Sequence, residues 1–140
     1  MKFLKWLGLI VLLLIIVNFL GPRPAAPRYD KALPNLPSQA VALEKYISDK
    51  EAQYKLKPDN EARIIWNNDS LKEKTDYAVL YLHGFSASQE EGDPVHYSFA
   101  KKFGCNLFLS RLAEHGIDTT EPMVNFTEDK LWNSAKEAYV

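Results

Sequence analysis

The pattern of apolar and polar residues divides the chain into a leader, a linker and a body. The leader is the longest apolar run, Phe3 to Leu20, which only Lys5 and Asn18 interrupt. As an α-helix, 18 residues span about 27 Å, which is marginal for a membrane hydrocarbon core of about 30 Å. Because no polar face runs along it, the segment is not typical of a buried core helix. Residues 1–20 are therefore predicted to form a transmembrane or signal helix.

The flanks of this run favour an uncleaved anchor over a cleavable signal peptide. The run ends in Gly21-Pro22-Arg23-Pro24, without the small-residue pattern that signal cleavage requires. No cysteine lies near its end, which excludes a lipoprotein anchor. The basic residues Lys2 and Lys5 favour a cytoplasmic amino terminus. The body is thus expected outside the cytoplasm, periplasmic or extracellular, and secreted if the leader is cleaved.

Residues 21–37 form the predicted linker. They hold five of the eight prolines of the chain, whose fixed φ angles favour an extended spacer. We expect this spacer to lift the body, residues 38–140, off the membrane without taking part in any chemistry.

Helix-like and strand-like segments alternate along the body. Residues 77–82 are a nearly continuous apolar run, typical of a strand buried on both faces of a mostly parallel sheet. Residues 62–66 and 106–112 are also predicted strands. Helices are predicted from the N-cap Ser38 to about residue 50, over residues 94–103 with Asp93 as the cap and Gly104 at the end, and after the N-cap Thr127. This order predicts a doubly wound α/β domain with helices on both faces of the sheet.

Charge and cysteine content narrow the possible partners. The formal net charge is −1, with a basic leader and linker and an acidic body, so a nucleic-acid partner is not expected. The single cysteine, Cys105, excludes an internal disulfide and a multi-cysteine zinc site. We expect it to be a buried small hydrophobic residue.

Metal and cofactor sites are likewise not expected. The three histidines, His83, His96 and His115, are too widely spaced to offer a local pair of zinc ligands. They are interpreted as a loop histidine after a strand, a helix-surface histidine and a second loop histidine. The acidic segment around Glu91 lacks the spaced ligands of a calcium loop and is expected to be solvated.

Two His-Gly pairs carry a resemblance to a known family. The strand at residues 77–82 ends directly in His83-Gly84-Phe85, and the loop Arg111-Leu112-Ala113-Glu114-His115-Gly116 follows the strand at residues 106–112. Residues 62–140 thereby resemble the amino-terminal half of an α/β-hydrolase of the serine esterase and lipase type. In that family a His-Gly pair after the third strand begins the oxyanion loop, and an Arg-Leu-x-x-His-Gly loop is common after the fourth.

The resemblance implies roles for the three residues of the first loop. Gly84 would let the backbone approach the reacting carbonyl closely, because it has no side chain. The Phe85 backbone N–H would be one oxyanion donor, and its partner would follow the nucleophile. His83 would support the loop.

The catalytic serine that the family requires is missing. No G-x-S-x-G sequence occurs in the chain, and the acid and histidine of the triad would follow the serine. No triad residue can be assigned, and Ser86 and Ser88 are expected to bond the backbone rather than act as nucleophiles. The chain is therefore predicted to be the amino-terminal portion of a membrane-anchored or exported serine hydrolase. Once completed, it would act on a small-molecule ester or acyl substrate.

A second interpretation is a non-catalytic, membrane-tethered binding or assembly module with half of a hydrolase sheet. The chain stops at Val140 inside a predicted helix, which in a finished protein would leave a sheet edge unpaired and Trp132 uncovered. We therefore expect the hydrolase portion rather than the module.

Overall fold

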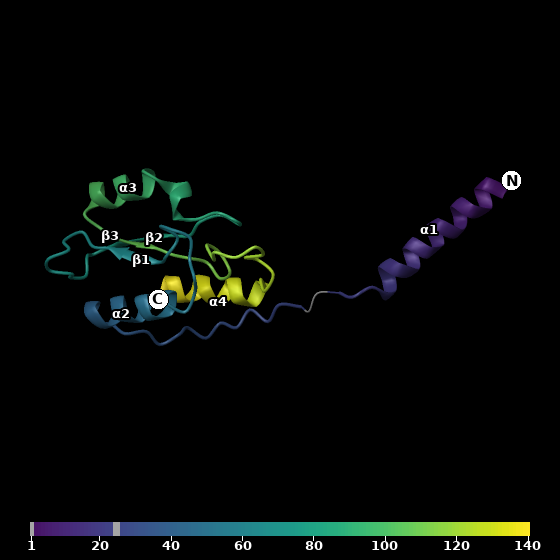
Figure 1. Cartoon of the computed structure of the whole chain (residues 1–140). Helices are drawn as coiled ribbons and strands as arrows, with labels where there is room; N and C mark the ends of the chain where they lie inside the picture. The colour runs from purple at the N-terminus through teal and green to yellow at the C-terminus, as the bar shows by residue number, and fades with distance from the viewer. Residues whose placement is uncertain (1, 24–25) are drawn as a thin grey trace.

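The computed structural model describes residues 2–23 and 26–140. Its first element, α1 (Lys2–Leu20), stands apart from the body (Figure 1). The segment Phe3–Leu20 has a mean hydropathy of 2.5 and none of it is buried. This confirms a helix that is long and apolar enough to be a membrane span or a signal sequence.

The body contains a small mixed sheet. In the part of the chain that the structure describes, β1 (Arg63–Ile65), β2 (Ala78–Tyr81) and β3 (Asn106–Leu109) pair in the order β1-β3-β2. β3 is the central strand, parallel to β2 and antiparallel to β1.

The predicted mostly parallel α/β-hydrolase sheet is wrong. One of the two strand pairs is antiparallel, and the strands are only three or four residues long. A parallel pair needs a crossover connection, usually helical, and only the connection from β2 to β3 contains a helix. The expectation that residues 77–82 form a strand buried on both faces is also wrong. β2 lies at the edge of the sheet and Ala78 is exposed.

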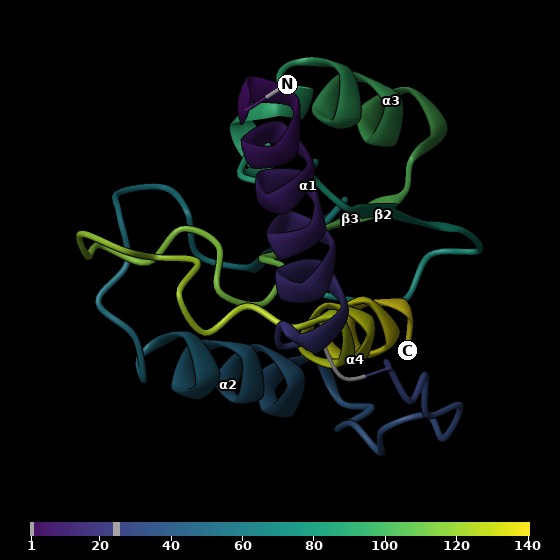
Figure 2. The same cartoon turned by 90° about the vertical axis from the view of Figure 1, so that its right-hand side faces the viewer.

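Three helices cover the sheet. α3 (Val95–Phe103) lies on one face, whereas α2 (Ala40–Glu51) and α4 (Glu128–Tyr139) lie on the other (Figures 1 and 2). A short 3-10 helix, η1 (Gln89–Gly92), precedes α3.

Two of the predicted helix boundaries are confirmed and two are wrong. Gly104 ends α3 in a left-handed conformation, with φ of 63°, which glycine adopts at little cost. The Thr127 side chain caps α4 by accepting from the Lys130 N–H. Ser38 does not cap α2, which begins after Gln39, and Pro94 rather than Asp93 stands at the start of α3. Neither of these helices has a side-chain cap.

The packed core lies between the sheet and α3. Ala100 of α3 meets Leu107 and Leu109 of β3, both with no exposed surface. Cys105 is buried beside this core, as predicted. Half-buried residues complete it: Ile65, Val79, Tyr81 and Tyr97.

The opposite face of the sheet is not packed in this way. A cavity of about 490 Å³ separates it from α2 and α4. The cavity opens to the surface, so its walls meet solvent unless a ligand occupies it.

Part of the predicted linker is bound to the body, which corrects its interpretation as a free spacer. The Arg28 N–H donates to Asp129 Oδ1 (2.8 Å), and the Trp132 Nε1–H donates to the Asp30 carbonyl (2.6 Å). Lys136 donates to the Ala32 carbonyl at 2.9 Å. We call residues 28–36 the α4 strap. Because the strap covers α4, Lys136 is buried there, whereas Trp132 remains partly exposed.

Candidate functional site

The candidate site is the loop after β2, which begins with His83. The His83 ring is buried, its Nδ1 lies 2.9 Å from the Gly84 carbonyl, and its Nε2 accepts the Leu112 N–H at 3.1 Å. Because Nε2 accepts, the ring proton belongs on Nδ1 and is donated to Gly84. Burial lowers the pKa of His83 and outweighs the hydrogen bond to the Gly84 carbonyl, which raises it. His83 is thus a neutral ring that joins the loop after β2 to the Leu112 backbone.

The second His-Gly loop binds the first one in return. His115 Nε2 accepts the Ser86 N–H at 3.0 Å, and its Nδ1 lies 2.8 Å from the Ala113 carbonyl. The centres of the His83 and His115 rings lie 4.9 Å apart. Each loop therefore contributes one histidine whose Nε2 accepts a backbone N–H of the other loop, which fixes the two loops relative to one another.

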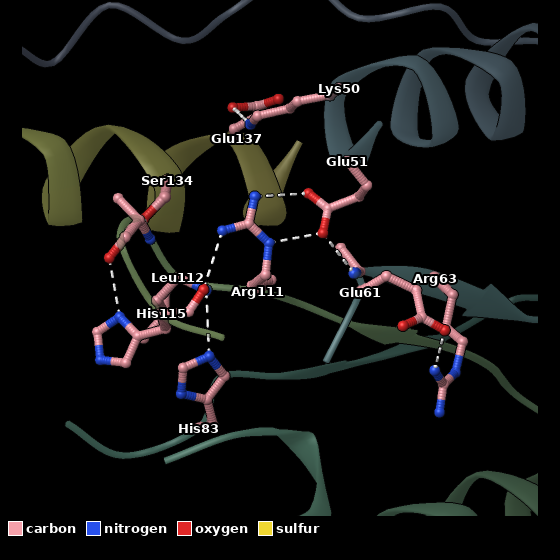
Figure 3. Close-up of polar contacts among 12 residues, drawn as sticks. Lys50, Glu51, Glu61, Arg63, His83, Arg111, Leu112, His115, Ser134 and Glu137 are labelled. Carbon is pink, nitrogen blue, oxygen red and sulfur yellow. Dashed lines mark hydrogen bonds and ion pairs between the residues drawn. The ribbon is translucent and has the colours of Figure 1, made fainter. Parts of the chain in front are cut away.

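A buried ion pair fixes the second loop to α2. The Arg111 guanidinium donates to both carboxylate oxygens of Glu51, at 2.6 and 3.0 Å, and to the His115 carbonyl at 3.1 Å (Figure 3). The two side chains are 5% and 9% exposed. The same guanidinium lies over the Tyr54 ring, 4.7 Å from its centre. A planar guanidinium suits this bidentate and stacked arrangement in a way that lysine does not.

The backbone N–H groups of the first loop differ in whether they have an acceptor. Gly84 donates to Glu91 Oε2 (2.7 Å), Ser86 to His115, and Ala87 to the Gly84 carbonyl (3.2 Å). The Phe85 N–H makes no hydrogen bond to any residue in the described ranges 2–23 and 26–140. It is therefore available to an acceptor from outside the loop.

Gly84 and Ser86 give the loop its shape. A Cβ atom at position 84 would lie 3.0 Å from Glu91 Oε1, so glycine permits the close approach of that carboxylate. Ser86 has a φ of 63°, a left-handed conformation that costs a residue with a side chain on the order of 1 kcal/mol. The hydrogen bond to His115 helps to hold it there.

The side chain of Phe85 packs against two other aromatic rings. It is 70% exposed and meets His115 and Phe126 edge to face, at 5.7 and 5.3 Å between ring centres. The residue that carries the free donor therefore also presents an apolar side chain to solvent.

The remaining candidate residues do not join this site. His96 is buried rather than on the helix surface, because its Nε2 bonds the Gln89 carbonyl at 2.9 Å and its ring packs on Tyr81. Across the residues whose placement is described, no cluster of ligands for a metal ion is found. Ser88 caps η1 through a bond from the Glu90 N–H, which confirms a backbone-bonding hydroxyl.

Sequence reasoning placed the loop but missed several of its partners. Glu91 is exposed, as expected of the acidic segment, but its contact with Gly84 was not predicted, and only its place seven residues later could have suggested it. Phe126 and Glu51 gave no local signal, since they lie far from the loop in sequence.

No protein-family model, curated protein or solved structure matches the chain. The resemblance to serine esterases and lipases therefore stays a prediction from the residues of the two His-Gly loops.

Proposed function

We propose that the loop His83–Phe85 is the oxyanion-binding side of a serine hydrolase that cleaves ester or related acyl bonds. The observation that carries the proposal is the Phe85 N–H, which alone among the N–H groups of residues 84–87 has no acceptor within the described part of the chain. The proposal concerns the chemistry of this loop and does not depend on the size of the sheet.

The chemistry requires a donor that is fixed before the reaction begins. When a nucleophile attacks an ester, the carbonyl oxygen becomes an oxyanion, and a preorganised N–H stabilises it without rearrangement. The histidine bonds to Leu112 and Ser86 provide that rigidity here. The loop also lies between a strand and the helix that follows it, where hydrolases carry this donor.

Glu91 sets a condition on the proposal. Gly84 is the residue before the proposed donor, and its N–H donates to Glu91 Oε2 at 2.7 Å. A negative charge at that place repels an oxyanion, so a bound anion would weaken or displace the contact between Glu91 and Gly84.

The proposal assigns no nucleophile to these 140 residues, because no G-x-S-x-G sequence occurs in them. We expect the chain by itself to hydrolyse p-nitrophenyl acetate no faster than its His83→Ala variant. Turnover that disappears in a Ser86→Ala variant would show that Ser86 is a nucleophile, and the proposal would then be wrong.

The donor itself is tested by amide chemical shifts. The full chain in detergent micelles, labelled with ¹⁵N, is titrated with a phosphonate monoester, whose tetrahedral anion mimics the oxyanion. We expect a saturable downfield shift of the Phe85 amide. An unmoved Phe85 amide at saturating phosphonate would contradict the proposal.

A pair of variants separates local charge from general effects. Glu91→Gln removes the carboxylate beside the donor, and the exposed neighbour variant Glu90→Gln is its control. Two like charges about 4 Å apart repel by about 1 kcal/mol in water, so Glu91→Gln is expected to tighten phosphonate binding about fivefold. Equal effects of the two variants would place the anion elsewhere.

We further propose that α1 is an uncleaved anchor and that the body lies outside the cytoplasm. Lys2 and Lys5 support this orientation, whereas Arg23 and Arg28 on the other flank weaken it. Protease added to intact cells should degrade the body, provided that the outer barrier is opened where one exists. Protection until the membrane is lysed would reverse the orientation.

A further inference from the structure

The cavity between the sheet and the helices α2 and α4 is separate from the His83–Phe85 loop, and nothing in the proposed function uses it. It measures about 490 Å³, which is within the range of about 300–1,000 Å³ that small-molecule sites occupy. It also opens to the surface, and Leu36 of the α4 strap is one of its lining residues.

The walls of this cavity are mostly apolar and come from the sheet and from the two helices α2 and α4. Helix α2 contributes Leu43 and Ile47, and α4 contributes Ala138; the sheet contributes Ile64, Leu80 and Phe108. Water in contact with such walls is unfavourable, so an apolar occupant gains free energy by replacing it.

One segment of the cavity lining is basic. Lys72, Lys74 and Thr75 line the cavity from the connection between β1 and β2. The other charged lining residues are paired, Lys50 with Glu137, Arg111 with Glu51, and Lys72 with Glu44 at 2.8 Å. Lys74 is exposed and forms no ion pair with the residues that the structure describes. The basic segment therefore offers an unpaired positive charge to a ligand.

We propose that this cavity binds a long-chain fatty acid, with the aliphatic chain between the sheet and the two helices and the carboxylate beside Lys74. The volume holds one aliphatic chain, and a single unpaired ammonium group matches a single carboxylate. A phospholipid with two acyl chains fits neither feature.

The position of the body relative to the membrane supports this ligand. α1 ends at Leu20 and the α4 strap is bound from Arg28 onward. The chain between these residues spans less than about 30 Å when fully extended. If α1 is the membrane anchor, the strap holds the body close to the bilayer, and Leu36 of the strap itself lines the cavity. Fatty acids that leave the bilayer would therefore meet the cavity at short range.

The test uses the full chain in lipid nanodiscs with palmitate that carries a photoreactive diazirine in the middle of its chain. After irradiation, digestion and mass spectrometry, we expect labelled peptides from α2, β1 and β3, which unlabelled palmitate suppresses. Labelling of α1 reports how much probe has entered the bilayer and serves as the internal reference. Labels confined to α1 would overturn the proposal.

Two variants decide where the ligand lies. Lys74→Glu reverses the charge of the unpaired lysine in the basic segment. It is expected to lower the labelling of the cavity peptides, relative to that of α1, at least about fivefold. Lys101→Glu makes the same change on the exposed side of α3 and should leave labelling unchanged. Ala138→Trp fills the cavity and should abolish labelling, provided that its circular dichroism matches that of the unmodified chain.

Three outcomes would contradict the proposal. They are equal labelling in the Lys74→Glu and Lys101→Glu variants, unchanged labelling in a folded Ala138→Trp variant, and equally strong labelling by a diacyl phospholipid probe. The last outcome would identify a membrane lipid rather than a fatty acid as the occupant.

Discussion

The two faces of the sheet are held in different ways. On the α3 face, Ala100, Leu107 and Leu109 pack with almost no exposed surface. On the α2 and α4 face, a cavity of about 490 Å³ takes the place of such a core. The first face is stabilised by apolar burial, which is strong and not directional.

Polar contacts hold the helices of the second face. Glu51 at the end of α2 binds Arg111, and Glu44 accepts from the Trp66 indole at 2.7 Å. Between the helices, the Tyr46 hydroxyl donates to Glu137 (2.6 Å), and this bond raises the pKa of Tyr46 to about 12. These contacts lie along α2 from Glu44 to Glu51 and join it to α4 and to the segments around the sheet. A layer that is held by directional bonds can keep a cavity that close packing would fill.

The largest expected effect comes from breaking the ion pair between Glu51 and Arg111. Arg111→Met would leave the Glu51 carboxylate buried without its partner and would remove the donor to the His115 carbonyl. Removing one partner of a buried ion pair costs about 3–5 kcal/mol. We expect a loss of that size in the free energy of unfolding, measured by urea titration of the full chain in detergent.

The double variant Glu51→Leu/Arg111→Met is the control for that experiment. Replacing both partners removes the unpaired charge, so part of the loss should be recovered. Full recovery is not expected, because Glu51 also accepts the Ala62 N–H. If Arg111→Met alone costs less than about 1 kcal/mol, apolar packing holds the second face after all.

A smaller loss in the free energy of unfolding is expected from two truncations in β3, one on each face of the sheet. The loss should differ between the two faces. Leu107→Ala removes a side chain with no exposed surface and should cost about 2–5 kcal/mol. Phe108→Ala removes a larger side chain, yet Phe108 lines an existing cavity and is only half-buried. We expect it to cost less than Leu107→Ala, measured by the same urea titration. The reverse order would mean that the cavity is filled by repacking in solution.

The sequence predicted the local features of the two faces and missed the contacts that distinguish them. Gly104 and Thr127 were correctly placed as helix boundaries, because capping depends on neighbouring residues. The antiparallel pairing of β1 and the bond between Glu51 and Arg111 join segments that lie far apart in sequence. No periodicity or spacing reports such pairs, and an isolated glutamate on a predicted helix indicates a solvated face.

In the candidate site too, the local feature was predicted and the contacts between distant residues were not. The position of His83-Gly84 at the end of a strand was predicted, since the apolar run stops directly before it. The reciprocal bonds through His115 and the approach of Glu91 were not predicted. They depend on how two loops meet at the edge of the sheet, which the short-range pattern does not determine.

The smallest effect is the pH dependence of stability that His83, in the loop after β2, produces. The pKa of His83 is lowered in the folded state, chiefly by burial, whereas the unfolded chain has the ordinary value of about 6.5. Below that value the unfolded state binds more protons than the folded state, so acid favours unfolding. The stability from neutral His83 is therefore fully present above about pH 6.5 and decreases as the pH falls from there toward the folded pKa.

Two measurements check the sign of this effect. The His83 ring protons should titrate with a midpoint below 6.5 in NMR spectra, and the unfolding free energy should fall as the pH is lowered from about 6.5. In a His83→Gln variant that decrease should be shallower, while the buried His96 supplies a matched control variant, His96→Gln. Protonation would also place a hydrogen on Nε2, opposite the Leu112 N–H, and so break one of the two histidine bonds between the loops. Phosphonate binding at Phe85 should then weaken over the same pH range, and a midpoint above 6.5 would contradict a neutral, buried His83.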